Sequence, residues 1–223
     1  MSIITMATTK GGAGKTTVAQ MILGAVHNFG YSVGVVDTDA NKTLSSWLDN
    51  NCSMAIDCIA VSDEDKIVST AKKMDRKHDL VIIDTAGVRN QATIFAIGCA
   101  DLVLVPVQLS NADAVEAIRT HRLVASTSAM VSREIPARVV YTDYTPKTNI
   151  AKQVRKKIRK HDLPVMKTRL HHLVAYKELT FTGKVPKKGT AGAQGQLLVQ
   201  EICDLGYLSF MQDDYIQQYR KAS

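Results

Sequence analysis

The stretch Lys10-Gly11-Gly12-Ala13-Gly14-Lys15-Thr16-Thr17 decides the fold class of this chain. It follows an apolar run typical of a buried strand, Ile3 to Ala7, and it opens a segment with a helical pattern, Lys15 to Asn28. Glycines between a strand and a helix let backbone amides approach phosphate oxygens, and the helix N-terminus adds a favourable dipole. The stretch therefore predicts a phosphate-binding loop.

The rest of the chain alternates short β-rich runs with helical stretches. The predicted strands are Ile3 to Ala7, Ser32 to Val36, Ala55 to Val61, Leu80 to Ile83, Leu102 to Val107 and Arg138 to Tyr141. The predicted helices are Lys15 to Asn28, Asp65 to Met74, Gln91 to Cys99, Ala112 to Ser126 and Ala193 to Leu205. Several strands are apolar on both faces, so we expect an α/β fold, with a mostly parallel central sheet flanked by helices on both faces.

Length and composition indicate one globular domain. The chain has 223 residues, of which 45% are hydrophobic and 22% charged, and this length suits a single α/β core spanning 1–223. We expect a basic helical and loop region at about 147–190 within it. No apolar run approaches the roughly 20 residues that span a bilayer, and the first residues indicate a strand, not a targeting segment.

Cysteine and histidine usage predicts no metal site and no disulfide framework. Cys52, Cys58, Cys99 and Cys203 lack the spacing of a metal site, and His171 and His172 have no nearby acidic or cysteine ligand. We therefore expect a reducing cytosol. The net charge of +7 permits contact with a polyanion without identifying one.

The phosphate-binding loop predicts nucleotide and magnesium ligands. Lys15 is placed to neutralise the β- and γ-phosphates, and the Thr16 hydroxyl to bind Mg²⁺. The backbone of Gly11, Gly12, Ala13, Gly14 and Thr17 completes the predicted phosphate site. A glycine-rich turn that only caps a helix is the weaker alternative, because strand, loop and helix all occur in register.

Three acidic residues follow predicted strands at the edge where ligands of open α/β sheets bind. Asp37 and Asp39 end the second strand and, standing alone, would favour a solvated turn. Asp84 ends a buried apolar strand, the form of a Walker B element that holds Mg²⁺, and Gly87 can offer a backbone amide near the γ-phosphate. The order of the three motifs makes the prediction specific.

One departure from the ordinary Walker pattern is informative, because Thr9 stands where glycine is usual and an additional lysine, Lys10, lies inside the loop. The chain thereby resembles the deviant Walker P-loop ATPases, a group that includes ParA and MinD. The resemblance implies that Lys10 reaches across an ATP-driven homodimer to the partner's nucleotide. It also implies an ATP hydrolase with slow basal turnover that a partner stimulates.

The resemblance extends to the acidic residues. Val35 to Asp39 is similar to the family's DxDPQ motif, in which Asp39 would help arrange the attacking water and Asp37 would lie close to the metal. Ala40 and Asn41 replace the usual Pro and Gln, so the conformation of this loop stays open. The implied catalytic residues are Lys10, Lys15 and Asp39, and the implied metal ligands are Thr16, Asp37 and Asp84. The segment Val105 to Ser110 fits either an ordinary strand end or the family's proline segment near the nucleotide.

Basic residues concentrate in one short helical stretch that contains no acid. At about 100° per residue one face carries Lys152, Arg155, Lys156, Arg159 and Lys160, whereas Val154 and Ile158 lie opposite. Arg169 follows in the same region. This pattern suits contact with a phosphate backbone, and a merely solvated face is the alternative.

Taken with the resemblance, these features favour a ParA-type ATPase that binds DNA nonspecifically and segregates plasmid or chromosomal DNA. With few residues before the first strand we expect no N-terminal helix-turn-helix, so a separate centromere-binding adaptor is implied, in the cytoplasm and at the nucleoid. A MinD-like membrane role is disfavoured, because the tail Asp213 to Arg220 is acidic at its start and poor in apolar anchors. An iron–sulfur relative is disfavoured because Cys99 lacks a second cysteine. A role in conjugation or DNA transfer stays open.

Overall fold

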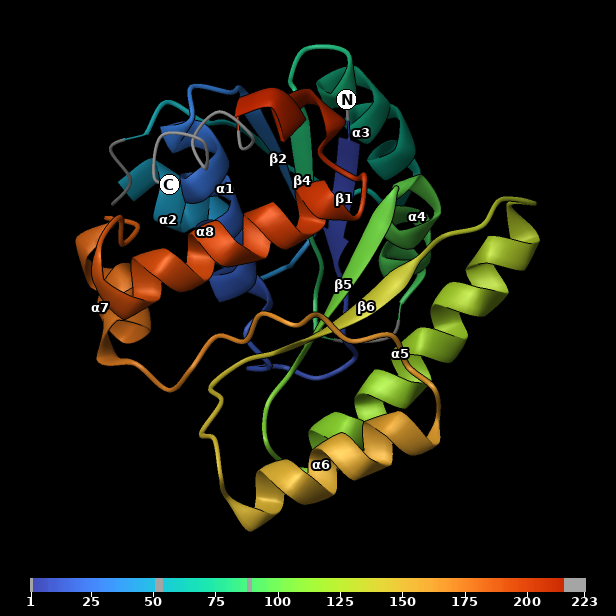
Figure 1. Ribbon diagram of the computed structural model, residues 1–223. Coiled ribbons are helices and arrows are strands. Elements are labelled where there is room, and N and C mark those ends of the chain that lie inside the picture. Colours follow the sequence, from blue (N-terminus) through green and yellow to red (C-terminus); the bar gives the residue numbers. More distant parts are fainter. Residues whose placement is uncertain (1, 51–53, 88–89, 215–223) are drawn as a thin grey trace.

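The computed structural model describes residues 2–50, 54–87 and 90–214 (Figure 1). All six predicted strands are present, and five of them are short runs of mostly buried residues, whereas β3, at the edge of the sheet, has no buried residue. They are β1 (Ser2–Met6), β2 (Val33–Asp37), β3 (Asp57–Ala60), β4 (Leu80–Asp84), β5 (Leu102–Val107) and β6 (Ala137–Tyr141). The helices are α1 (Lys15–Asn28), α2 (Thr43–Asn50), α3 (Ile67–Asp75), α4 (Gln91–Cys99), α5 (Asn111–Met130), α6 (Asn149–Lys160), α7 (Val174–Thr182) and α8 (Gly189–Asp204).

The strands form one parallel sheet in the order β3-β2-β4-β1-β5-β6. After β1 the chain moves to β2 on one side, and it returns to β5 on the other side of β1. The carboxyl end of β1 therefore lies at the point where the strand order reverses, which is where open α/β sheets bind ligands. The loop that follows β1 is brought beside the ends of β4 and β5.

Helices cover both faces of the sheet, as predicted. One hydrophobic core joins α1, α2, α7 and α8 to the sheet, and two others join α3, α4, α5 and α6 to the opposite face (Figure 1). Trp47 is buried in the first core, and its Nε1 donates to the Leu179 carbonyl oxygen at 2.8 Å. This bond fixes α2 against α7.

Helix α2 is not among the predicted helices, and two further features were not predicted from the sequence. Helix α7 lies in a region where the alternation of the pattern weakens, and Gly183 ends it with a φ of 64°. The chain between α6 and α7 runs beside β6, where the Val139 N–H donates to Pro164 O and the Met166 N–H donates to Val139 O, each at 2.8 Å. That segment covers part of the sheet edge without forming a regular strand.

The C-terminal stretch follows α8 through a short 3-10 turn, Ser209–Met211, in which Met211 is buried. Tyr215, Ile216 and Tyr219 of the predicted tail, and Cys52, lie outside the described residues. Over the described ranges no helix is long and apolar enough to cross a bilayer.

Candidate nucleotide site

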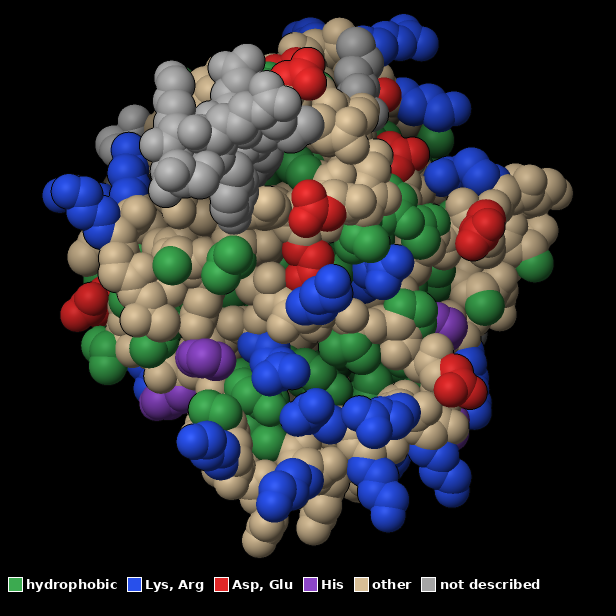
Figure 2. Space-filling model, in the orientation of Figure 1, with side chains coloured by type: hydrophobic (Ala, Val, Ile, Leu, Met, Phe, Trp, Pro, Cys, Tyr) green, Lys and Arg blue, Asp and Glu red, His purple; other side chains and the backbone are tan. Residues whose placement is uncertain are grey.

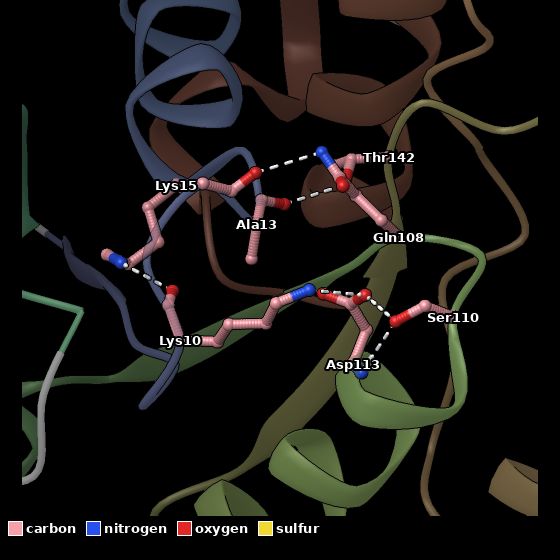
Figure 3. A network of polar contacts seen from close by, with 8 residues as sticks. Lys10, Ala13, Lys15, Gln108, Ser110, Asp113 and Thr142 are labelled. Carbon is pink, nitrogen blue, oxygen red and sulfur yellow. Dashed lines mark hydrogen bonds and ion pairs between the residues drawn. The ribbon is translucent and has the colours of Figure 1, made fainter.

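The phosphate-binding loop lies between β1 and α1, and two left-handed glycines shape it. Gly12 has a φ of 75° and Gly14 a φ of 94°, values that favour glycine. Side chains from two other strand ends hold the loop, as Figure 3 shows. The Thr142 hydroxyl donates to Ala13 O at 2.7 Å, and the Gln108 amide donates to Gly12 O at 2.9 Å. The segment after β5 therefore contacts the loop directly.

Lys15 is the first residue of α1 and is buried. Its Nζ donates to the backbone oxygen of Lys10 at 3.4 Å, so the ammonium lies folded over the loop. Burial lowers the pKa of Lys15, while the negative charges of Asp84 and Asp39 act in the opposite direction. The lysine thus lies among the groups that the sequence places around the phosphates.

Asp84 ends β4 and faces the start of α1. Its Oδ2 accepts a hydrogen bond from the Thr16 hydroxyl at 2.8 Å, and its Oδ1 is buried with no hydrogen-bond partner among the described residues. Burial raises the pKa of Asp84 to about 7. A buried carboxylate oxygen without a partner, beside a threonine hydroxyl, fits a hard divalent cation. These two residues are therefore suited to hold Mg²⁺.

Asp37 and Asp39 occupy different positions. Asp37 is buried, and its two oxygens accept the backbone N–H groups of Asp39 at 3.0 Å and Ser45 at 2.9 Å. It therefore organises the loop after β2, a role that the sequence did not indicate. Asp39 lies at the cavity and accepts the Asn41 N–H at 2.9 Å, which shows how this loop folds without the usual proline.

Gly87 lies directly against the phosphate-binding loop. A Cβ atom at this position would lie 2.7 Å from the Gly11 backbone nitrogen, closer than real contacts allow. Glycine is therefore required for the segment after β4 to approach the loop, as its predicted role beside the γ-phosphate demands.

Lys10 points away from Lys15 toward the N-terminus of α5. Its Nζ lies 2.8 Å from Asp113 Oδ2, and the Ser110 hydroxyl contacts the same oxygen (Figure 3). Thr9, which replaces the usual glycine, donates its hydroxyl to Glu116 on the same helix. The side chain of Lys10 is 36% exposed, whereas that of Asp113 is 2% exposed. Lys10 is thus accessible but tied within its own chain.

A cavity of about 620 Å³ lies over the loop and contains Gly11, Gly12, Gly14, Lys15, Thr16, Thr17, Asp39 and Gly87. It continues along α2 and reaches Gln20, Trp47, Asn50 and Thr180, which sequence reasoning did not assign. Gln20 could have been found from its place one turn after Thr16, but Thr180 has no sequence signal. The cavity brings together predicted residues that follow β1, β2 and β4, whereas Lys10, Ala13, Asp37 and Asp84 are not among the residues that line it.

The predicted basic residues lie apart from this cavity, on α6 and the segment after it. Ala151, Val154 and Ile158 are buried, while Lys152, Lys156, Arg159 and Lys160 are exposed and Arg155 is partly exposed. Within the described ranges none of these five cations forms an ion pair. The predicted two faces of the helix are confirmed.

Comparison with known proteins agrees with this geometry. The model of the VirC1 protein family matches residues 1–188. The chain is 34% identical over 148 residues to the protein ParA of Rhizobium radiobacter, a match covering 66% of each protein. Among solved structures, the ATP complex of a Cyanothece McdA variant superposes with a TM-score of 0.76 at 17% identity, over 92% of this chain and 96% of that one.

The MinD cell division protein of Aquifex aeolicus gives a TM-score of 0.74 at 17% identity, over 92% of this chain and 97% of that chain. At such identities the likeness establishes the fold, a sheet and loop arrangement shared with these proteins. The match of the family model to residues 1–188 is what assigns the chain to a family. The chain belongs to the VirC1 protein family and is a P-loop ATPase of the ParA and MinD type.

Proposed function

We propose that this protein is an ATP-dependent dimerising ATPase that binds DNA nonspecifically and drives plasmid or chromosome partitioning. The observation that carries the proposal is the pair of lysines in one phosphate-binding loop. Lys15 is buried over the loop, whereas Lys10 is partly exposed and bound to Asp113. One lysine suits the chain's own nucleotide, and the other is accessible to a second copy.

The cavity residues supply the means for ATP hydrolysis. Backbone amides of the loop bind phosphate oxygens, and Lys15 stabilises the charge that develops on the γ-phosphate. Asp39, in the cavity lining, would orient water, while Thr16 and Asp84 would hold the metal. Mg²⁺ held there would supply positive charge that neutralises the phosphates. Catalysis of this kind rests on positioning, so we expect slow turnover until a partner protein completes the positioning of the attacking water.

In the proposed dimer, Lys10 exchanges its contact with Asp113 for a contact with the nucleotide of a second copy. To reach the nucleotide of a second copy, Lys10 must leave Asp113, whose buried carboxylate then loses its ion pair. ATP compensates this loss by offering Lys10 the stronger negative charge of a triphosphate. The ADP-bound chain offers less charge, so the internal pair and the monomer are favoured.

DNA binding is supported by the exposed face of α6. Its cations lack carboxylate partners in the described structure, so contact with phosphates does not first require breaking ion pairs. Lys157 differs from them, since its Nζ donates to Asn111 Oδ1 at 2.7 Å. Asn111 begins α5, the helix that holds Asp113, so one helix contacts both the loop lysine and the basic helix.

The test is binding to random-sequence duplex DNA with ATP, ADP or no nucleotide at two salt concentrations, for the wild type and Lys10→Ala. We expect much tighter binding with ATP than with ADP or without nucleotide, weaker binding at higher salt, and loss of the ATP-dependent binding in the variant. The double variant Lys72→Ala, Lys73→Ala on α3 removes charge from a different surface and serves as the control. It should bind as the wild type does.

Equal affinity for the duplex with ATP, with ADP and without nucleotide would contradict the proposal that ATP controls DNA binding. Absence of DNA binding in every nucleotide state, with ATP hydrolysis intact, would contradict DNA partition. It would then favour the alternative role, a positioning ATPase for membrane or protein cargo such as a DNA-transfer complex. An adaptor protein that stimulates hydrolysis is expected in either case.

A further inference from the structure

A second cavity, of about 450 Å³, lies between α6 and the segment after it, away from the phosphate-binding loop. Four basic side chains line this hollow, namely Arg155, Arg159, Lys167 and Arg169. Asp162 is the one acid in the lining, and it forms no ion pair with them in the described structure. Unpaired cations that converge on one cavity repel one another, so the hollow is built to receive negative charge.

The tertiary structure holds these side chains in place. Glu201 of α8 accepts the backbone N–H groups of Lys167 at 2.6 Å and Thr168 at 2.8 Å, and the Leu170 N–H donates to Tyr141 O at 2.9 Å. The segment is thereby fixed opposite α6. The Arg169 guanidinium lies 5.0 Å from the centre of the Tyr144 ring, and its Nε is buried without a partner among the described residues.

The floor of the hollow is apolar and aromatic. Tyr141, Leu163 and Met166 line it and are buried, and Figure 2 shows Lys and Arg side chains gathered around a hydrophobic area on this face. Burial raises the pKa of the Tyr141 phenol, while the positive charges of Arg155, Arg169 and Arg159 act in the opposite direction. The three guanidinium groups therefore lie near this ring.

This combination differs from what a duplex requires. Phosphates of a duplex lie on its outer surface and are met by exposed cations such as those on the outer face of α6, while its bases stay stacked inside. An unpaired base can turn out of its strand and lie against apolar surface or arginine planes, with its phosphate held by cations. The cavity has the size of a small-molecule site.

We propose that the hollow lined by Arg155, Arg159, Lys167 and Arg169 binds one unpaired nucleotide of single-stranded DNA, with the base on the apolar floor. The inference rests on the DNA binding proposed above and adds which form of DNA this site selects. The exposed lysines of α6 then contact neighbouring phosphates of either form.

The experiment measures fluorescence anisotropy of the full chain with ATP, using a 20-nucleotide single strand, the matching duplex and an abasic single strand of equal length. Arg155→Gln with Arg159→Gln changes the hollow. Lys152→Gln with Lys156→Gln removes the same charge from the exposed side of the same helix. We expect the hollow variant to lose tenfold or more in affinity for the single strand but threefold or less for the duplex. The control variant should lose equally on both.

On the abasic strand the two variants should behave alike, since the base contact is absent. Equal losses of affinity by the hollow variant on the single strand and on the duplex would overturn the inference. A loss by this variant on the abasic strand as large as its loss on the intact single strand would also overturn it. If the wild type binds duplex DNA but the hollow variant shows no selective loss, this inference fails while the proposed function stands. If the wild type binds single strands selectively and no duplex, partition of duplex DNA fails and the hollow stands.

Discussion

The nucleotide cavity and the basic face of α6 are built in opposite ways. Around the phosphate-binding loop the charged groups are buried and engaged, as Asp37, Lys15 and the pair of Thr16 with Asp84 show. On α6 four of the cations, Lys152, Lys156, Arg159 and Lys160, are exposed and lack acidic partners in the described structure. Buried groups can be positioned for chemistry, whereas exposed cations supply affinity that salt screens. The effects of substitutions in the two regions should therefore differ in size and in their dependence on salt concentration.

The largest effect is expected at the cavity. Lys15→Ala should lower kcat/KM for ATP hydrolysis by a thousandfold or more, because the charge on the γ-phosphate loses its nearest cation. Steady-state phosphate release measures this, and thermal unfolding checks that the variant is folded. Lys156→Ala, an equal charge change on α6, should keep turnover within about twofold. A loss below tenfold in Lys15→Ala would show that the buried lysine is dispensable.

Asp84 tests the same region through pH. Because burial raises its pKa to about 7, the folded chain holds this proton more tightly than the unfolded chain does. The stabilisation is complete below about pH 4 and is lost as pH rises through about 7. The side chain in Asp84→Asn cannot ionise. Without Mg²⁺ and nucleotide, the free energy of unfolding of this variant at pH 8 should therefore exceed that of the wild type by on the order of 2–4 kcal/mol.

Urea unfolding of both proteins between pH 4.5 and 8 measures this difference. Thr16 can still donate to the amide oxygen of the variant, so its contact is kept. A stability difference that does not change with pH would contradict the burial of an ionisable carboxyl at this position.

Substitutions on the basic face should have smaller effects than those at the cavity. They should change DNA affinity and its dependence on salt concentration. Lys152→Ala with Lys156→Ala and Lys160→Ala removes three phosphate contacts. The slope of log affinity against log salt should fall by about 2.7, with a loss of roughly tenfold to a hundredfold in duplex affinity. Titrations at several salt concentrations measure both, and ATP hydrolysis should be unchanged. An unaltered slope would mean that this face does not contact DNA.

The smallest effect is expected where the two regions meet. Lys157→Ala removes the hydrogen bond to Asn111 at the start of α5. A change in the contact of Lys10 with α5 should then no longer affect the position of α6. We expect the ratio of DNA affinities with ATP and ADP to change by about threefold, within the range of a lost hydrogen bond. Lys156→Ala should lower both affinities and keep their ratio. An unchanged ratio in Lys157→Ala, with a changed ratio in Lys156→Ala, would show that the contact between Lys157 and Asn111 does not couple the nucleotide site to DNA binding.

The sequence by itself determined the fold class and indicated most of the residues around the phosphate-binding loop that form the candidate nucleotide site. The glycine pattern, the two lysines and the strand-end acids are local signals, because each follows directly from the strand or loop that carries it. Parallel strands then bring their carboxyl ends to one edge, so Thr16 and Asp84 meet although 68 residues separate them. The two faces of α6 were likewise readable, since helical periodicity is local.

Only the tertiary structure decided the contacts between distant segments. It gave Asp37 the backbone of Asp39 and Ser45 as partners, placed Thr180 at the cavity and joined Lys10 to Asp113. It also brought Arg169 and Arg155 together in the lining of the second hollow. Helix α7 escaped prediction because packing against α2, not periodicity, holds it. Such contacts depend on how helices pack on the sheet, and no short sequence pattern specifies them.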